Sequence, residues 1–411
     1  MDPEFTQSFD VFNHTDPGIR FDSANETWTI SPDVLVSSGT NDGVHSDFNG
    51  STLLNEGTIL SGGQFQAGVN FQDNAAHVTN ASGATIIGAR DGIVVDGDTA
   101  TIDNFGLVEG LTGRGVDFGE ESQTVTLTNM GSISGGEAGV RAFANDDGGI
   151  IHNFGRIASD QDGIEVDSGT GQTTVITNTG GATIRGGNDA IHVELGGISL
   201  DNQGTLDGGI LVENSADAVR IVNHGRINGA VELGPGNDVF LGAGGSGVVA
   251  IGGNGDDMLV GGSKRDFLFG EDGNDRVIGG AGNDVLGGGP GPGFDTLTGG
   301  RGSDQFVFVS DLDPAHDLAR ITDFTANVDK IVLVATVFTH LGRAGVLPQG
   351  EFHVGAAAGD HGDRIIYNPH TGFLFYDSDG SGAAAEIHFA TVNPHLALHN
   401  TDFHIIPDFG L

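Results

Sequence analysis

Short alternations of polar and apolar residues recur along residues 1–232 with a period of about 24 residues. The segment from Thr124 to Thr128 is typical, because threonine alternates there with valine and leucine. Each alternation leads into an N-x-G-x-(I/L/V) frame, and a Gly-(Ile/Val) pair follows about twelve residues later. The frames begin at Asn55, Asn104, Asn129, Asn153, Asn202 and Asn223, with slightly longer versions from Asn80 and Asn178. Alternation without a helical period predicts three short strands in each repeat.

Three strands that close within about 24 residues make one coil of a stacked solenoid. The pattern resembles the right-handed parallel β-helix found in polysaccharide lyases and epimerases, and we therefore expect this fold for residues 1–232. Stacking would align the recurrent asparagines in a ladder, because a side-chain amide in a turn can bind the neighbouring coil.

A second repeat, nine residues long, occupies residues 233–309. Its aspartates are Asp257, Asp266, Asp275 and Asp284 at nine-residue spacing, then Asp295 after a two-residue insertion, then Asp304, with Asp238 opening the series. An apolar residue stands two positions after each of the six later aspartates: Leu259, Leu268, Val277, Leu286, Leu297 and Phe306. A flexible Gly/Asp linker would not keep a fixed apolar position, so the pattern predicts stacked turns with inward apolar side chains.

The G-G-x-G-x-D-x-U-x frame has the chemistry of a calcium site. Calcium takes six to eight oxygen ligands at roughly 2.3–2.6 Å, and glycines let several backbone carbonyls converge while the aspartate adds a carboxylate. The predicted ligand positions are Asp238, Asp257, Asp266, Asp275, Asp284, Asp295 and Asp304, with Gly253, Gly255, Gly262, Gly273, Gly280 and Gly282. The turn from Gly244 to Ile251 has Val249 near the expected aspartate, which predicts a missing or altered site there.

These nonapeptides resemble the calcium-binding repeats-in-toxin (haemolysin-type) family. The resemblance implies a parallel β-roll over residues 233–309, with Ca²⁺ between successive turns, that continues the β-helix without a linker. The apolar, aromatic residues 310–411 resemble the C-terminal segment of secreted serralysin-type and haemolysin-type proteins, which implies a β-rich cap that carries an export signal. The resemblance further implies a secreted, extracellular protein that is exported by type I secretion machinery and folds outside the cell.

The composition limits the partners. With 56 acidic against 16 basic residues among 411, the net charge is −40. Nucleic acid and anionic membrane surfaces are therefore excluded as expected partners, because both require clustered Lys and Arg. No segment approaches the roughly 20 apolar residues of a membrane-spanning helix, so we expect no membrane insertion. The chain has no cysteine, so metal and core packing must stabilise it without disulfides.

Candidate chemistry in the β-helix lies on outward positions, which stacking arranges in rows. The residue after each Gly-(Ile/Val) pair would align Asp117, Arg141, Glu165 and His192. Such a row suits a polysaccharide lyase, in which Arg141 neutralises a uronate carboxylate and His192 removes the proton next to it. Acidic polysaccharide is then the expected partner.

Two alternatives remain open for this row. A glycoside hydrolase would use paired carboxylates, either Asp117 with Glu165 or the next outward pair, Asp167 with Glu194. A non-catalytic adhesin or surface-matrix protein would need the row only as a charge-balanced face, because like charges directly opposite each other are destabilising. Residues directly before the Gly-(Ile/Val) pairs form a further row that we expect to be turn residues: Asp91, Arg114, Asp162 and Asp189.

Overall fold

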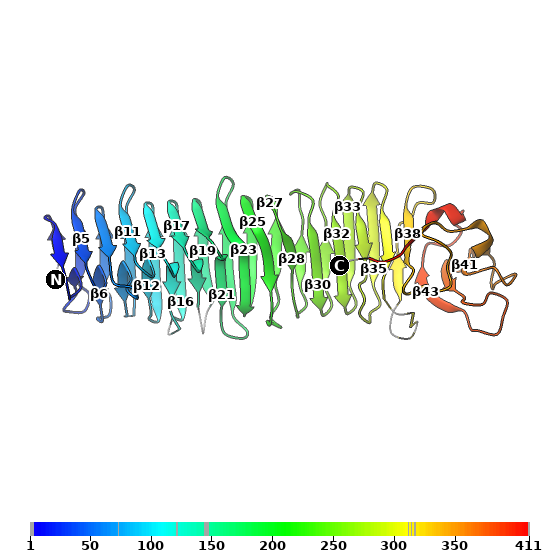
Figure 1. Ribbon diagram of the computed structural model, residues 1–411, viewed down its shortest axis with the longest axis horizontal. Coiled ribbons are helices and arrows are strands. Elements are labelled where there is room, and N and C mark those ends of the chain that lie inside the picture. Colours follow the sequence, from blue (N-terminus) through cyan, green and yellow to red (C-terminus); the bar gives the residue numbers. More distant parts are fainter. Residues whose placement is uncertain are drawn as a thin grey trace. The chain divides into compact units, whose positions relative to one another are not determined.

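The computed structural model describes residues 4–72, 74–120, 122–143, 148–310, 312–313, 315 and 318–409. This part of the chain is all-β, a parallel β-solenoid without α-helix, with two short 3-10 helices, η1 (Gln349–Glu351) and η2 (Asn400–Asp402). It forms two compact units, unit 1 (Met1–Ala230) and unit 2 (Val231–Leu411) (Figure 1). The sequence-based boundaries at residues 232 and 309 stay predictions.

Each coil of unit 1 contributes one strand to each of three parallel series. The first series is β1 (Glu4–Gln7), β4 (Thr27–Ile30), β7 (Thr52–Asn55), β10 (Ala76–Asn80), β13 (Thr99–Asn104), β16 (Thr124–Asn129), β19 (Gly149–Asn153), β22 (Thr173–Asn178), β24 (Gly197–Asn202) and β26 (Arg220–Asn223). The second is β2 (Val11–Asn13), β5 (Leu35–Ser38), β8 (Thr58–Ser61), β11 (Thr85–Gly88), β14 (Leu107–Gly110), β17 (Ser132–Gly135), β20 (Arg156–Ser159), β23 (Thr183–Leu195), β25 (Thr205–Val212) and β27 (Arg226–Ile227). The third is β3 (Ile19–Arg20), β6 (Val44–Ser46), β9 (Val69–Phe71), β12 (Ile93–Val95), β15 (Arg114–Phe118), β18 (Ala138–Ala142) and β21 (Asp162–Asp167), after which β23 and β25 run through the second and third series alike.

Register in unit 1 follows the sequence repeat. Leu127 of β16 lies opposite Ile102 of the coil before and Ile151 of the coil after, and all three are fully buried. Alternate residues of most strands point inward, and these are mainly apolar apart from the asparagines that end the first-series strands. One slip in register would therefore expose the core face. The strand β28 (Ala230–Glu232) follows at the division between the units.

The predicted asparagine ladder is confirmed. Each side-chain amide donates from Nδ2 to Oδ1 of the asparagine one coil later at 2.8–2.9 Å, from Asn55 through to Asn223. The same Nδ2 of Asn129 donates to the carbonyl of Arg156 at 3.0 Å. The ladder satisfies backbone carbonyls at a turn that is closed to water, where an unpaired polar group is costly.

Unit 2 begins as a two-sided roll. One side is β29 (Val239–Leu241), β31 (Met258–Val260), β33 (Arg276–Ala281), β35 (Thr296–Arg301) and β37 (Ala319–Ile321), and the other is β30 (Val249–Asn254), β32 (Phe267–Asp272), β34 (Val285–Gly287), β36 (Gln305–Phe308) and β38 (Lys330–Val334). The six predicted inward residues, Leu259, Leu268, Val277, Leu286, Leu297 and Phe306, are fully buried. The nonapeptides therefore form the calcium-binding β-roll that their sequence predicts.

The cap comprises β39 (Gly345–Val346), β40 (Phe352–Val354), β41 (Ile365–Asn368), β42 (Phe373–Tyr376), β43 (Ile387–Thr391) and β44 (Phe403–Ile406). Two of its strands extend the roll in parallel, β43 beside β37 and β44 beside β38. The C-terminal segment then packs on the outer face of the roll, where the rings of Phe409 and Phe269 lie 5.2 Å apart. The cap thus covers both the end and one face of the roll.

Replacing Asn129 with alanine should lower the free energy of unfolding of unit 1 by about 2–4 kcal/mol, because it leaves buried polar groups of Asn153 and Arg156 without their partner. Thr128→Ala is the matched control, since Thr128 is the neighbouring outward residue of the same strand, and it should change stability by less than about 1 kcal/mol. Urea unfolding of both variants measures the difference, and equal midpoints would contradict a stabilising ladder.

Candidate functional site

The aspartates of the roll form two ladders that tie successive coils together. Along β29, β31, β33 and β35, Oδ1 of Asp257 accepts the N–H of Asp238 at 2.8 Å, and Oδ1 of Asp275 accepts the N–H of Asp257 at 2.8 Å. On the other side, Oδ1 of Asp284 accepts the N–H of Asp266 at 2.9 Å. The continuing steps run to Asp295, to Asp304 and onward to Asp329.

The second carboxylate oxygen has a different environment. In Asp257, Asp275 and Asp284, Oδ2 is buried and has no hydrogen-bond partner within the described residues. Burial is the main cause that raises the pKa of Asp257 to about 8 and the pKa values of Asp275 and Asp284 to about 6. A buried carboxylate oxygen without a donor favours either a proton or a cation.

Glycines make the space around these oxygens. A Cβ added at Gly252, Gly270 or Gly279 would collide with Oδ2 of the aspartate in the same repeat. The second glycine of a repeat faces a backbone carbonyl instead, and a Cβ on Gly253, which has φ +108, would collide with the carbonyl oxygen of Gly234. The other predicted glycines, Gly255, Gly262, Gly273, Gly280 and Gly282, stand against the carbonyl oxygens of Gly236, Gly242, Gly255, Gly262 and Lys264.

This donor set fits calcium. In the part of the chain that the structure describes, no group of three His, Cys, Asp or Glu side chains could hold an ion by itself. A cation at the roll would therefore combine the orphaned Oδ2 atoms with backbone carbonyls, which are the hard oxygen ligands that calcium prefers. The assignment of individual ligands stays a prediction for all thirteen positions.

The degenerate turn differs from its neighbours. The sequence places Val249 near the position of the missing aspartate. In the structure the preceding residue, Val248, takes this position in the ladder and donates its N–H to Oδ1 of Asp266 at 2.9 Å. Oδ2 of Asp266 accepts the N–H of Gly262 at 2.7 Å, so both oxygens of this carboxylate have donors. Asp266 therefore lacks the orphaned oxygen of Asp257, Asp275 and Asp284.

In unit 1, the structure brings together the four residues of the predicted charged row. Asp117, Arg141, Glu165 and His192 lie directly opposite one another on β15, β18, β21 and β23. Arg141 is held by Asp117 through two hydrogen bonds, Nε to Oδ1 at 2.7 Å and Nη2 to Oδ2 at 3.1 Å. This bidentate pair fixes the guanidinium against the sheet.

Arg114 joins the row, although the sequence predicts it as a turn residue. Its Nε lies 3.4 Å from Oε2 of Glu165, and its Nη1 lies 3.8 Å from Oδ2 of Asp117. The turn interpretation is wrong for Arg114, Asp162 and Asp189, which lie in strands β15, β21 and β23. The side chain of Arg114 is only 14% exposed. Its position three residues before Asp117 was the available signal.

The imidazole of His192 is flanked by carboxylates at longer range. Its Nδ1 lies 3.6 Å from Oδ2 of Asp162 and its Nε2 lies 3.7 Å from Oε1 of Glu213. Within the described residues, Nε2 is buried and has no hydrogen-bond partner. A base that acts on a polymer through Nε2 would need the neighbouring side chains to move.

The carboxylate pair of Asp167 and Glu194 is not in register. A bulge between Val166 and Asp167 places Asp167 opposite Leu195. Burial first, and then the nearby carboxylates of Glu194 and Glu165, raise the pKa of Asp167. The expected in-register pairing is therefore wrong, while the two carboxylates still interact.

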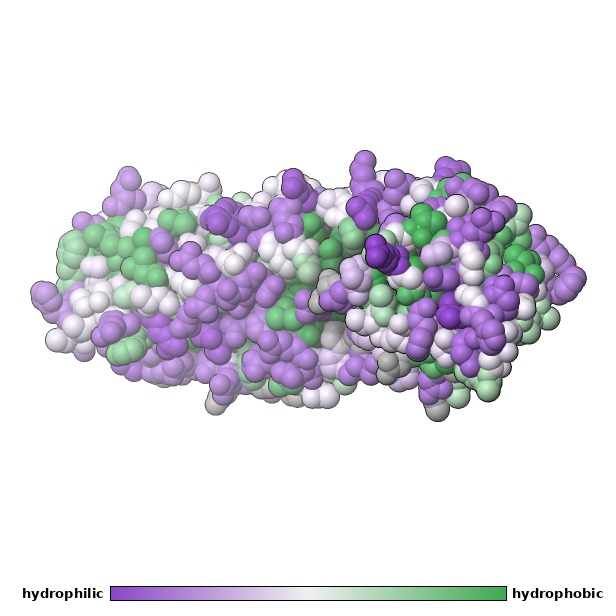
Figure 2. All heavy atoms as spheres, turned by 45° about the vertical axis from the view of Figure 1, so that its right-hand side comes forward, coloured by the Kyte–Doolittle hydropathy of each residue, from purple (hydrophilic) through white to green (hydrophobic). Residues whose placement is uncertain are grey.

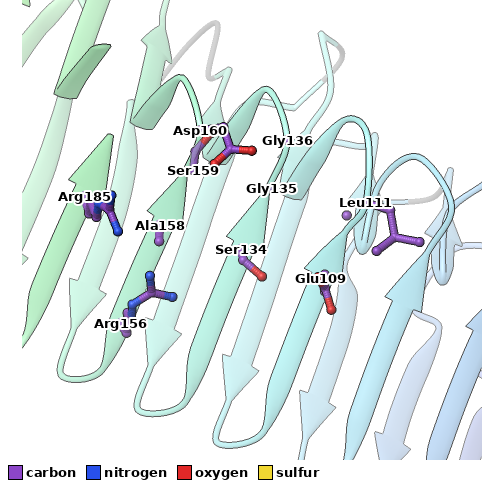
Figure 3. A pocket seen from close by; sticks show the side chains of 11 residues that line it. Glu109, Leu111, Ser134, Gly135, Gly136, Arg156, Ala158, Ser159, Asp160 and Arg185 are labelled. Carbon is purple, nitrogen blue, oxygen red and sulfur yellow. The ribbon is translucent and has the colours of Figure 1, made fainter. Parts of the chain in front are cut away.

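A groove on the second series of unit 1 was not foreseen from the sequence (Figure 3). Glu109, Ser134, Ala158 and Arg185 lie in register across β14, β17, β20 and β23. The two short side chains in the middle leave a hollow between the two long ones, with a volume of about 220 Å³. The sequence does place two short side chains between two long ones in this row. Only a comparison of side-chain sizes along the row would have revealed the groove.

Arg156 stands at the edge of this groove, two residues before Ala158 on the same strand. It is exposed and forms no ion pair or side-chain hydrogen bond within the described residues. Arg185, by contrast, lies 3.6 Å from Asp207. Many hydrophilic side chains cover the face seen in Figure 2, and acidic residues outnumber basic ones by 56 to 16 in the chain.

Comparison with protein families identifies the roll. The model of the RTX calcium-binding nonapeptide repeat (4 copies) matches residues 251–286 and 291–308. The chain thus carries RTX repeats, and these imply Ca²⁺ as its bound ion. Among solved structures, the chain is similar to the solution structure of the AlgE6R3 subunit from the Azotobacter vinelandii mannuronan C5-epimerase, at 25% identity over 36% of this chain and 78% of that chain, with a TM-score of 0.25. A search of the curated proteins found no match. Within the described residues, no helix has the length and hydrophobicity needed to cross a bilayer.

Replacing Asp275 with asparagine should have opposite effects with and without calcium. The amide keeps an oxygen to accept the N–H of Asp257 but removes the buried charge. In calcium the melting temperature of unit 2 should fall and calcium affinity should drop at least about tenfold, because affinity depends on ligand charge. In chelator the variant should melt at or above wild type, because no charge is buried. Asp98→Asn removes an exposed charge in unit 1 and should do neither.

The roll without calcium should become more stable as the pH falls from about 8 to about 5. The folded-state pKa values of Asp257, Asp275 and Asp284 lie above the ordinary aspartate value, so the folded state takes up protons. This stabilisation is complete below the unfolded pKa of about 3.9 and is lost as the pH rises through the folded values. In calcium the trend should reverse, because protons compete with the ion. Thermal melts across this range, with and without chelator, measure both trends, and parallel trends would contradict the assignment.

Proposed function

We propose that the protein is an extracellular, calcium-stabilised protein that binds acidic polysaccharide in the groove of unit 1. The observation that carries this proposal is the hollow between Glu109 and Arg185, at whose edge the guanidinium of Arg156 has no ion pair or side-chain hydrogen bond within the described residues. The RTX repeats support a calcium-rich setting outside the cell, and the proposal includes secretion by type I machinery, as the resemblance implies.

The groove suits a sugar with a carboxylate. Ser134, Ala158 and the neighbouring glycines form a floor of small residues on which one face of a sugar ring can lie, while Arg156 can supply charge-assisted hydrogen bonds. Glu109 and Asp160 offset Arg156 and Arg185, so the lining is formally neutral on a chain of net charge −40. A linear polymer of uronates would otherwise be repelled by most of this surface.

The charged row supports binding rather than β-elimination. A lyase built on Arg141 and His192 needs a guanidinium free to meet the substrate and an accessible base. Arg141 is engaged by Asp117, and Nε2 of His192 is shielded from solvent. The pairing of Asp117 with Arg141 and of Arg114 with Glu165 is instead what a charge-balanced face requires.

Hydrolysis is the second candidate function, and Asp167 is the observation that favours it. Its pKa is raised by burial and by the carboxylates of Glu194 and Glu165, which is the environment of a general acid. Glu165 or Glu194 would then act as the partner carboxylate. This reaction would need a polymer that lies across β21 and β23.

The proposal is tested with alginate, pectate, hyaluronan and chondroitin in calcium-containing buffer. At least one of these polymers should bind the protein saturably, and Arg156→Ala should weaken that binding about tenfold, because a charged hydrogen bond contributes roughly 1.5–3 kcal/mol. Arg220→Ala is the matched control, since Arg220 is also exposed and unpaired within the described residues but lies on β26, away from the groove.

The same incubations separate binding from catalysis. Absorbance of unsaturated uronate products would establish a lyase, and new reducing ends that disappear in Asp167→Asn would establish the hydrolase. Binding without either signal supports the proposal. Equal loss of binding in Arg156→Ala and Arg220→Ala would show that only net charge matters and would contradict the groove as the site.

A further inference from the structure

Unit 2 contains a second cavity, with a volume of about 450 Å³, between the last coil of the roll and the cap. This size falls within the roughly 300–1,000 Å³ of small-molecule sites. Its polar lining comprises Arg320, three threonines, Asn393 and Asp295, and Asp295 is also one of the predicted calcium ligands.

Three of these polar residues lie in one row. Thr296 of β35 is opposite Arg320 of β37, and Arg320 is opposite Thr391 of β43. Adjacent strands are about 4.8 Å apart, so one threonine stands on each side of Arg320 in the row. Arg320 is exposed and has no ion pair within the described residues, which leaves its planar donor fork available to a carboxylate.

Apolar side chains form another wall of the cavity. Phe294 is 52% exposed, which is high for an aromatic residue, and Leu318 and Pro394 also line the space. Asn393 is held in place by its own hydrogen bond, from Nδ2 to the carbonyl of Thr322 at 2.7 Å. An aromatic ring beside a cation and hydroxyls matches a sugar ring that has one apolar face and one carboxylate.

The aspartate ladder holds the frame of this cavity. The N–H of Thr296 donates to the carbonyl of Asp275 at 2.7 Å, and the N–H of Arg320 donates to the carbonyl of Asp295 at 2.8 Å. Phe294 precedes Asp295 directly and donates its N–H to Oδ1 of Asn274 at 3.1 Å. Loss of order in the ladder would therefore displace the row and the aromatic wall together.

We propose that this cavity is a second, calcium-dependent binding site for a uronic acid residue, with Arg320 on the carboxylate and Phe294 against the ring. The inference rests on the proposed function for the class of its ligand, but it concerns a different unit and different residues. The cap then contributes to recognition as well as closing the roll.

The test uses the full chain with Phe294→Trp and Trp28→Phe, which moves the only tryptophan from unit 1 to the cavity. A galacturonate trisaccharide is the probe, and an uncharged galactose trisaccharide is its control. In calcium, the charged probe should change the tryptophan fluorescence saturably. Arg320→Ala in this background should weaken the response at least about tenfold, whereas Arg301→Ala, an exposed arginine of β35 outside the cavity, should leave it within about twofold.

Each outcome decides a different point. Loss of the response in chelator, with its return on adding calcium, supports the coupling to the ladder, and persistence in chelator overturns it. An equal response to the uncharged trisaccharide, or to the charged one after Arg320→Ala, overturns the carboxylate assignment. Calorimetry on wild type separates this inference from the proposed function: heat of binding without any fluorescence change places the sugar in the groove of unit 1 alone.

Discussion

The roll depends on buried aspartate carboxylates, whose charge is costly to remove from water. Each aspartate donates its own N–H to the aspartate one coil later and uses Oδ1 to receive the N–H of the coil before, so the carboxylate is part of the backbone pairing. The remaining oxygen of Asp257, Asp275 and Asp284 is closed to water and, within the described residues, has no donor. A bound cation should therefore stabilise the folded unit strongly, because it neutralises charge that is costly to bury, and protons can replace it only at lower pH.

Repetition explains why so much of the structure could be predicted. The asparagine ladder, the inward residues of the nonapeptides and the alignment of Asp117 with Arg141 all follow once one coil is known to stack on the next in register. The bulge at Asp167 could not be foreseen, because it depends on an extra residue in β23 rather than on the period. The interactions of Arg114 depend on side-chain reach, which the period does not describe.

Neither cavity could be predicted from the sequence repeat. The groove in unit 1 arises because short side chains at Ser134 and Ala158 fall between long ones, which is a property of one row and not of the repeat. The cavity around Arg320 needs Thr391 and Pro394, which return from the cap after more than seventy residues. The spacing of residues in the sequence does not predict that these cap residues pack beside Arg320.

The asparagine ladder has a consequence for how such a chain can change in evolution. The interior rungs make the same hydrogen bonds to their neighbours, whereas Nδ2 of Asn223, the last rung, is buried without a hydrogen-bond partner within the described residues. Gain or loss of one whole interior coil would rejoin equivalent rungs and leave the remaining interior intact. The length of a coil can also vary, because the ladder continues across spacings of 21 to 25 residues as long as the asparagine stays in register.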